Sequence, residues 1–244
     1  MRELRVFLKK LMFMIEVGFQ YIKGDIMKGH FVQLQALEEE DYNLFSKWVR
    51  PSKISALARG SQDFATVREI KMDIESGNTR YATVLTHEGE KIGFISWQPL
   101  KYEGSYVLGG VIGDSNLWDM GYGAEASILI MDYLFHFKNA HKIQFINGLY
   151  NLRTIRFLMK NNVAIEGILR DHFFLDGEYH DAVVSSILRD EYYAAGEGEQ
   201  PEDMIPKIEK EQIRTELYEY LNNYWENTLF SRLKKTGEEN GMER

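Results

Sequence analysis

The fold of this chain is decided by residues 106–137, which read YVLGGVIGDSNLWDMGYGAEASILIMDYLFHF. An apolar, strand-like run ends at Gly113, and a glycine-rich turn at residues 120–124 opens directly into a helix of about three to four turns. Such a turn can leave several backbone N–H groups unpaired at one point, where the helix adds the positive end of its dipole. The glycines let a ligand approach the backbone closely, because no Cβ stands in the way. The pattern favours a site for a phosphate or diphosphate group, although taken alone it is also typical of ordinary tight turns.

Length and composition indicate one large domain, alone or with an appendage, since the chain has 244 residues. Cysteine is absent, which excludes disulfides, thiolate catalysis and Cys-ligated metal sites and is compatible with a cytoplasmic protein. The net charge of −8 argues against broad binding to nucleic acid, and it favours a cationic substrate such as an amine, or simply solubility. The six histidines show no HxH or HExxH spacing, so we expect no metal site.

The N-terminal residues 1–26 contain an apolar run. Six apolar side chains fit one face of a helix, namely Leu4, Phe7, Leu8, Leu11, Met12 and Ile15. Glu16 interrupts the run and no small-x-small cleavage site follows it, which argues against a signal peptide. We interpret the segment as an amphipathic helix that packs on the domain or on a partner. The alternative is that Met27 is the native start. The chain has no run of about eighteen apolar residues, so we expect no membrane partner.

Strands and helices follow one another on both sides of the glycine-rich turn. Alternating patterns and turn signals predict the strands, at residues 31–37, 80–86, 91–100, 106–112, 142–149, 165–174 and 180–188. Apolar residues spaced three and four apart predict helices at residues 38–48, 61–76 and 151–160, in addition to the central one. This order predicts an α+β fold, in which a mixed, mostly antiparallel sheet carries helices on both faces.

The composition changes beyond Tyr193. Residues 194–207 are rich in Gly, Glu and Pro, and we interpret them as a linker. Residues 208–244 form a C-terminal extension with a predicted helix at residues 209–235, whose apolar side must be buried against the main domain or a second subunit. We favour a homodimer contact through this helix. The domain between the two extensions covers residues 27–193.

Three segments resemble the GCN5-related N-acetyltransferase (GNAT) superfamily, in particular its ribosomal-protein-alanine and spermidine acetyltransferase-like branch. The phosphate loop of that family follows the pattern Arg/Gln-x-x-Gly-x-Gly/Ala, and residues 118–123 here read WDMGYG. Residues 151–160, NLRTIRFLMK, resemble the family's Asn-x-x-Ser/Ala helix, and residues 166–181, EGILRDHFFLDGEYHD, resemble its final hairpin. The resemblance covers residues 31–193. It implies a GNAT fold and an acetyl-CoA-dependent N-acetyltransferase that acts by direct transfer to a primary amine.

The resemblance also implies where coenzyme A would bind. Backbone groups of residues 111–113 would hold the pantetheine arm, the amides of residues 120–124 would bind the diphosphate, and Asn151 would use its side-chain amide. The implied set is Val111, Ile112, Gly113, Trp118, Met120, Gly121, Tyr122, Gly123, Ala124, Asn151, Phe157 and Lys160. For Lys160, a solvated helix lysine is an equal interpretation.

Acetyl transfer to an amine needs a neutral nucleophile, a polarised thioester carbonyl and a proton for the departing thiolate. Backbone N–H groups near Ile112 are candidates for the polarisation. Tyr106, at the start of the strand before the loop, and His180 and Asp181, after the hairpin turn, are the candidate catalytic side chains. Each also has a structural interpretation, as a core tyrosine or as a hairpin residue.

Two departures from the family pattern favour a rival interpretation. Many members have a tyrosine where this chain has Leu158 and a glutamate where it has Val107. The rival is a non-catalytic acyl-CoA-binding module. A third hypothesis, a Rossmann-type nucleotide-binding protein, disagrees with the antiparallel strands ahead of the turn. The sequence leaves the acceptor open among a protein N-terminus, a polyamine, an amino sugar and an aminoglycoside-like antibiotic.

Overall fold

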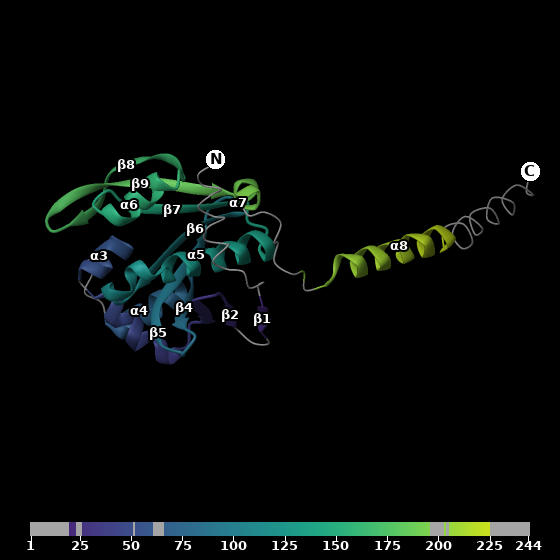
Figure 1. The fold of residues 1–244 in the computed structure, drawn as a ribbon, viewed down its shortest axis with the longest axis horizontal. Helices are drawn as coiled ribbons and strands as arrows, with labels where there is room; N and C mark the ends of the chain where they lie inside the picture. The colour runs from purple at the N-terminus through teal and green to yellow at the C-terminus, as the bar shows by residue number, and fades with distance from the viewer. Residues whose placement is uncertain are drawn as a thin grey trace, which may run out of the picture. The chain divides into compact units, whose positions relative to one another are not determined.

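The computed structural model of the chain describes residues 20–22, 26–50, 52–60, 66–195, 203 and 205–224. Contacts divide the chain into two units, Met1–Pro201 and Glu202–Arg244, and each is described by itself. The first unit has a central sheet with helices packed against it (Figure 1).

Nine strands form this sheet within the described residues. They are β1 (Gln20–Ile22), β2 (Ile26–Lys28), β3 (Val32–Ala36), β4 (Arg80–Thr86), β5 (Lys91–Pro99), β6 (Ser105–Ile112), β7 (Lys142–Gly148), β8 (Ala164–Leu175) and β9 (Glu178–Leu188). Their spatial order is β1-β2-β3-β4-β5-β6-β7-β9-β8. All neighbours pair antiparallel except β6 and β7, which are parallel. The predicted mixed, mostly antiparallel sheet is therefore confirmed.

Helices pack on both faces of the sheet and form two cores. The helices of the first unit are α2 (Tyr42–Val49), α3 (Lys53–Arg59), α4 (Val67–Ser76), α5 (Tyr122–Asp132), α6 (Leu152–Lys160) and α7 (Arg189–Ala195), with the helical turns η1 (Glu39–Asp41), η2 (Ser115–Met120) and η3 (Tyr133–Phe137). Phe45 and Ile70 of α2 and α4 pack with Phe94 and Val111 of the sheet in the smaller core. The larger core surrounds α5.

Among the helices in the described ranges, none is long and apolar enough to cross a membrane.

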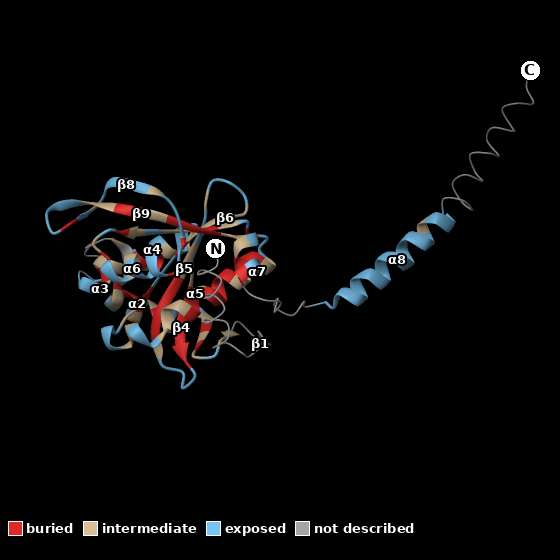
Figure 2. Ribbon diagram, turned by 45° about the horizontal axis from the view of Figure 1, so that its top comes forward, coloured by how far each residue is buried: buried red, intermediate tan, exposed pale blue. Residues whose placement is uncertain are grey.

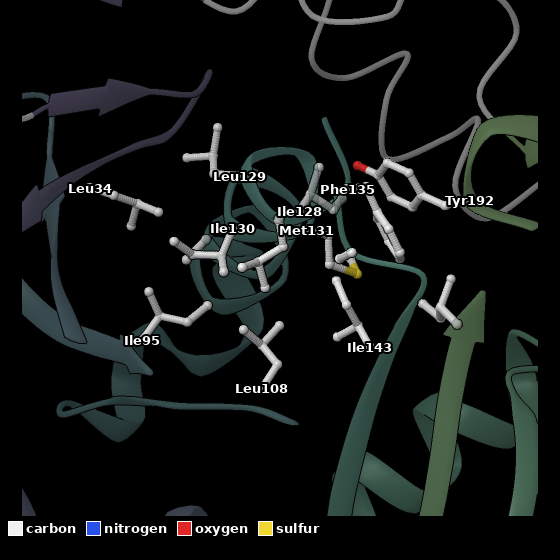
Figure 3. Packing of buried hydrophobic residues seen from close by; sticks show 14 of the residues in the cluster. Leu34, Ile95, Leu108, Ile128, Leu129, Ile130, Met131, Phe135, Ile143 and Tyr192 are labelled. Carbon is white, nitrogen blue, oxygen red and sulfur yellow. The ribbon is translucent and has the colours of Figure 1, made fainter. Parts of the chain in front are cut away.

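Helix α5 is the centre of the larger core. Its residues 128–131 are all buried, so the helix contacts protein on every side and has no solvent face there. Figure 3 shows these side chains among Ile95, Leu108 and Ile143 of the sheet and Tyr192 of α7. Figure 2 shows that buried residues concentrate in α5 and the central strands, whereas β8 at the sheet edge is largely exposed. The core thus fixes the position of the helix that follows the glycine-rich turn.

The end of α5 carries a carboxylate with an altered pKa. Burial raises the pKa of Asp132 to about 7, while a 2.6 Å hydrogen bond from the Tyr192 hydroxyl opposes the rise. The unfolded chain has the ordinary value of 3.8, so between these pH values the folded state binds more protons than the unfolded state. This carboxyl group therefore contributes stability that is complete below about pH 4 and is lost as the pH rises through about 7.

The substitution Asp132→Asn is expected to raise the melting temperature at pH 8 and to raise it by less than half as much at pH 5. Asparagine keeps an acceptor for the Tyr192 hydroxyl and carries no charge. A pKa displacement of this size corresponds to at most about 4 kcal/mol, and because Asp132 is partly accessible we expect a gain of about 1–2 kcal/mol. Thermal unfolding of both proteins from pH 5 to pH 8 measures the effect. The same pH dependence in both would contradict it.

The N-terminal boundary of the sheet differs from the predicted domain boundary. β2 pairs with β3, and β1 pairs with β2, so the boundary predicted at Met27 lies inside a strand. Residues 20–22 and 26, which the sequence interpretation included in an N-terminal helix, are strand residues because they continue this pairing. The apolar residues 4–15 that suggested the helix lie outside the described residues.

The second unit contains the predicted C-terminal helix, as α8 (Lys207–Tyr224). Its apolar side chains, including Ile213, Leu217 and Tyr220, are exposed within that unit. The rest of the predicted helix, residues 225–235, and most of the predicted linker, residues 196–202 and 204, lie outside the described residues. Pairing of two copies through this helix stays a prediction.

Candidate functional site

Strands β6 and β7 separate in the middle of the sheet. Their parallel pairing joins residues 105–107 to residues 142–144 and ends there, while β6 continues to Ile112 and β7 to Gly148. Over these remaining lengths β6 stays paired with β5, and β7 with β9. The sheet is therefore open between its two parallel strands toward their carboxyl ends, which is where α/β sheets commonly bind ligands.

One edge of this opening offers backbone hydrogen-bonding groups. Gly113 N donates to Ile92 O at 2.8 Å, so this amide faces β5. Successive residues of an antiparallel strand alternate in direction, and the N–H groups of Gly110 and Ile112 therefore face the opening. Of the three residues predicted to hold a pantetheine arm, Ile112 offers its amide to the opening, while the amides of Val111 and Gly113 are turned toward β5.

Helix α3 joins the two sides of the opening. It packs against β6. Tyr150, which follows β7, donates its hydroxyl to Ala56 O at 3.1 Å, and Asn151 Nδ2 donates to Leu57 O at 3.2 Å. Two carbonyls of α3 are thus bonded to the segment between β7 and α6. The sequence interpretation assigned no helix here and gave Tyr150 no role.

Local sequence explains why α3 forms. The Ser52 hydroxyl accepts from Ser55 N, and the Ser55 hydroxyl accepts from Ser52 N, which is a complete capping box. Gly60 ends the helix with φ 63° and ψ 24°, in the left-handed region. The Phe173 ring of β8 occupies the place where a side chain at position 60 would begin. The end of α3 is therefore held against the β8–β9 hairpin.

The glycine-rich turn has the conformation that its sequence predicts. Gly121 caps α5 with φ 85° and ψ −8°, and the first helical hydrogen bond runs from Glu125 N to Gly121 O at 3.0 Å. The amides of residues 122–124 precede that bond. A Cβ at Gly121 would have no atom within 4 Å, and one at Gly123 would meet only Ile112 Cγ1, at 3.5 Å. The space in front of the turn is open, as an anion site at a helix N-terminus requires.

Trp118 connects the turn to its two neighbours. Its Nε1 donates to Ile112 O at 2.8 Å, which holds the turn against the end of β6. Arg153 of α6 lies over the indole, 5.7 Å from the ring centroid to the guanidinium carbon, and its Nη2 is 3.1 Å from Asp119 Oδ1. The sequence interpretation included Trp118 but not Arg153.

A buried carboxylate lies directly behind the turn. Glu125, 2% exposed, accepts hydrogen bonds from the backbone N–H groups of His30, Phe31 and Val32 at 2.6, 2.7 and 2.8 Å. A Cβ at Gly29 would lie 2.7 Å from the carboxylate carbon, so the close approach requires glycine there. Glu125 thereby fixes the chain that enters β3 to the first turn of α5. The only sequence signal for this role was a charge inside an apolar helix.

Three predicted cofactor residues lie at the start of α6 or within it. One of them caps the helix, and the other two have exposed side chains. Asn151 is buried, and its Oδ1 accepts from Thr154 N at 3.2 Å while its Nδ2 bonds Leu57 O. The amide therefore positions α6 relative to α3. Phe157 and Lys160 are exposed on the same helix.

The three predicted catalytic side chains do not meet at one point. Tyr106 lies on β6 before the opening begins, against the core around α5. The His180 ring lies 5.3 Å from the Tyr150 ring, near the carboxyl end of β7. Asp181 Oδ1 accepts from Asp171 N at 2.9 Å and so holds an irregular part of the hairpin.

Leu158 contributes packing to this region. It is 5% exposed and belongs to the core around α5. The position where the resemblance would place a tyrosine therefore supplies no proton donor.

Comparisons with known proteins point to one family. Residues 32–163 match the family model described as the acetyltransferase (GNAT) domain. The spermidine N(1)-acetyltransferase of Escherichia coli K12 is 27% identical over 168 residues, which cover 68% of this chain and 90% of that protein. An uncharacterized N-acetyltransferase, p20, of Bacillus licheniformis is 26% identical over 121 residues, which cover 50% of this chain and 68% of that protein.

Solved structures share the fold. The spermidine N-acetyltransferase of Vibrio cholerae, solved with CoA and spermine, superposes with a TM-score of 0.59 at 20% identity, over 66% of this chain and 97% of that one. An acetyltransferase of the GNAT family from Bacillus anthracis gives a TM-score of 0.58 at 18% identity, over 68% of this chain and 99% of that one.

Proposed function

This chain belongs to the GNAT acetyltransferase family, and from that premise we propose that it acetylates a primary amine of a polyamine-like cation. Membership makes it an acetyl-CoA-dependent N-acetyltransferase, as the resemblance implied. Two observations support the choice of acceptor. The Escherichia coli relative, matched over 90% of its length, is a spermidine acetyltransferase. The net charge of −8 attracts a multiply charged cation more than a neutral amine or an acidic peptide.

The observation that carries the acetyl-CoA part of the proposal is the contact between the end of β6 and the glycine-rich turn. Ile112 is the last residue of β6, and its carbonyl accepts the Trp118 bond that holds the glycine-rich turn. An extended arm can therefore bind along the edge of β6, through the N–H groups of Gly110 and Ile112, while its diphosphate meets the amides of residues 122–124. These residues fit acetyl-CoA because they combine a strand edge with an anion site.

Backbone and side-chain groups of the chain suit parts of the reaction. Of the two N–H groups that face the opening, that of Gly110 is farther from the turn and can donate to the thioester oxygen as negative charge develops there. His180, beside Tyr150 at the wide end of the opening, is the proposed base for the amine. Catalytic roles for Tyr106 and Asp181 stay predictions. Because Leu158 offers no proton, the thiolate is expected to take its proton from the amine or from water.

One observation favours the alternative of a non-catalytic acyl-CoA-binding module. Leu158 is buried where many family members have a tyrosine, so a common proton donor is absent from α6. Such a module would bind the carrier and release no thiol.

The experiment is an assay of thiol release from acetyl-CoA with a panel of amines. We expect saturable release with spermidine and spermine, and little with an aminoglycoside or a peptide that has a free N-terminal alanine. Spermidine acetylated at every nitrogen, which lacks a free amine, is the matched control. Saturation by the peptide alone would overturn the polyamine assignment. Binding of acetyl-CoA without release for any amine would support the non-catalytic module.

A further inference from the structure

We propose that Arg153, the second residue of α6, binds the diphosphate of coenzyme A at the glycine-rich turn. The inference rests on the acetyl-CoA site proposed above and adds a side chain from a separate helix. Arg153 follows Asn151, whose side chain caps the helix and fixes its start.

The acidic charge of the turn makes a cationic side chain beside it favourable for binding a diphosphate. Residues 118–124 contain the carboxylate of Asp119 and no lysine or arginine, and the whole chain has a net charge of −8. Backbone amides at a helix start carry only partial positive charge, equivalent to about half an elementary charge. A diphosphate held there would also experience repulsion from Asp119. A full positive charge next to the turn removes this disadvantage.

Arg153 lies in a position to provide this positive charge. Its guanidinium stacks on Trp118, and the hydrogen bond from Trp118 to Ile112 O fixes the indole beside the turn. The Arg153 side chain is 47% exposed, so it is accessible to a ligand in front of the turn. The planar guanidinium can donate two parallel hydrogen bonds to phosphate oxygens while one face stays on the indole.

The ion pair with Asp119 orients Arg153 without holding it strongly. Asp119 is 97% exposed, and ion pairs of this kind contribute between about 0 and 1 kcal/mol. Exchange of the carboxylate for a phosphate oxygen therefore costs little, because it replaces a weak exposed pair with a charge-assisted contact that can be bidentate.

The test is a calorimetric measurement of coenzyme A affinity for four variants. Arg153→Met is expected to weaken binding about tenfold or more, the usual effect of losing a charged hydrogen bond. Lys71→Met is the matched control, because Lys71 also pairs with a carboxylate, that of Glu39, and lies over a ring, that of Tyr42, but does so on α4. It should leave the affinity unchanged.

The two variants at Asp119 separate binding from charge neutralisation. If Arg153 binds phosphate, the double variant Asp119→Asn with Arg153→Met stays as weak as Arg153→Met alone, while Asp119→Asn alone binds at least as tightly as the wild type. If Arg153 only neutralises Asp119, the double variant regains full affinity, and the proposal is overturned.

Fragments of coenzyme A identify which of its phosphates Arg153 contacts. With dephospho-coenzyme A, which lacks the 3′-phosphate, the loss caused by Arg153→Met should be as large as with coenzyme A, and with pantetheine it should vanish. A loss confined to coenzyme A would assign Arg153 to the 3′-phosphate and overturn the diphosphate contact. Wild-type protein that binds no coenzyme A would overturn the whole site, whereas equal binding by wild type and Arg153→Met would overturn this inference alone.

Discussion

Tryptophan in place of Gly123 is expected to abolish coenzyme A binding and, with it, acetyl transfer. Gly123 lies in the first turn of α5, among the amides that precede the first helical hydrogen bond. Its missing side chain would point into open space next to Ile112. An indole there fills the volume in front of the turn, which the phosphates need. We expect at least a hundredfold loss of affinity, equivalent to about 3 kcal/mol.

The matched variant is Gly123→Ala. A methyl group would make only an ordinary contact, 3.5 Å from Ile112 Cγ1, so the turn should keep its shape and most of its affinity. Calorimetry with coenzyme A measures both variants, and thermal unfolding shows whether each is folded. A folded tryptophan variant that binds coenzyme A as the wild type does would refute the assignment of the turn.

Leucine in place of Glu125 is expected to cause a large loss in the free energy of unfolding. The carboxylate is the acceptor for the N–H groups of His30, Phe31 and Val32. Leucine is similar in size but leaves these donors without their acceptor in a buried place, at a cost of about 1–3 kcal/mol for each donor that water does not reach. We expect a total near 4 kcal/mol, or a fall of about 10 °C in melting temperature.

Two further variants make this measurement specific. Glu125→Gln keeps one acceptor oxygen but presents an amide to the remaining donors, so its loss should be intermediate. Glu90→Leu changes an exposed glutamate and should have little effect. Thermal and urea unfolding of all three variants give the comparison. Equal stability of Glu125→Leu and wild type would contradict the anchoring role of the carboxylate.

Most strands could be predicted because their signal is local. The alternation of apolar and polar residues located β4, β5 and β6 within about one residue of their observed ends. Helix α3 was missed because it has only seven residues, too few for a periodic pattern to show. Its signal lay in the Ser52 and Ser55 capping box and in Gly60, which are markers of helix ends. The predicted helix at residues 61–76 is observed as α4 from Val67, and residues 61–65 lie outside the described ranges.

The glycine-rich turn could be predicted because glycine itself determines its geometry, as the φ of 85° at Gly121 shows. The contacts of Arg153 with Trp118, and of Tyr150 with Ala56, could not be predicted. Each joins residues distant in the sequence, and each depends on how far β6 and β7 separate. The hydrogen bonds of the Asn151 side chain could not be predicted either. An asparagine at the start of a helix can use the same side-chain amide to cap the helix or to contact a ligand.

The attachment of α3 to both sides of the opening determines how the opening can change. Beyond residues 107 and 144 no sheet pairing joins β6 to β7. Their spacing there depends on the Tyr150 and Asn151 bonds to α3, on the packing of α3 against β6, and on the contact of Arg153 with Trp118. Side-chain substitutions at these few contacts would widen or narrow the gap while the strand register stays intact. Evolution can therefore adapt the room for a bulkier or slimmer acceptor without rebuilding the sheet.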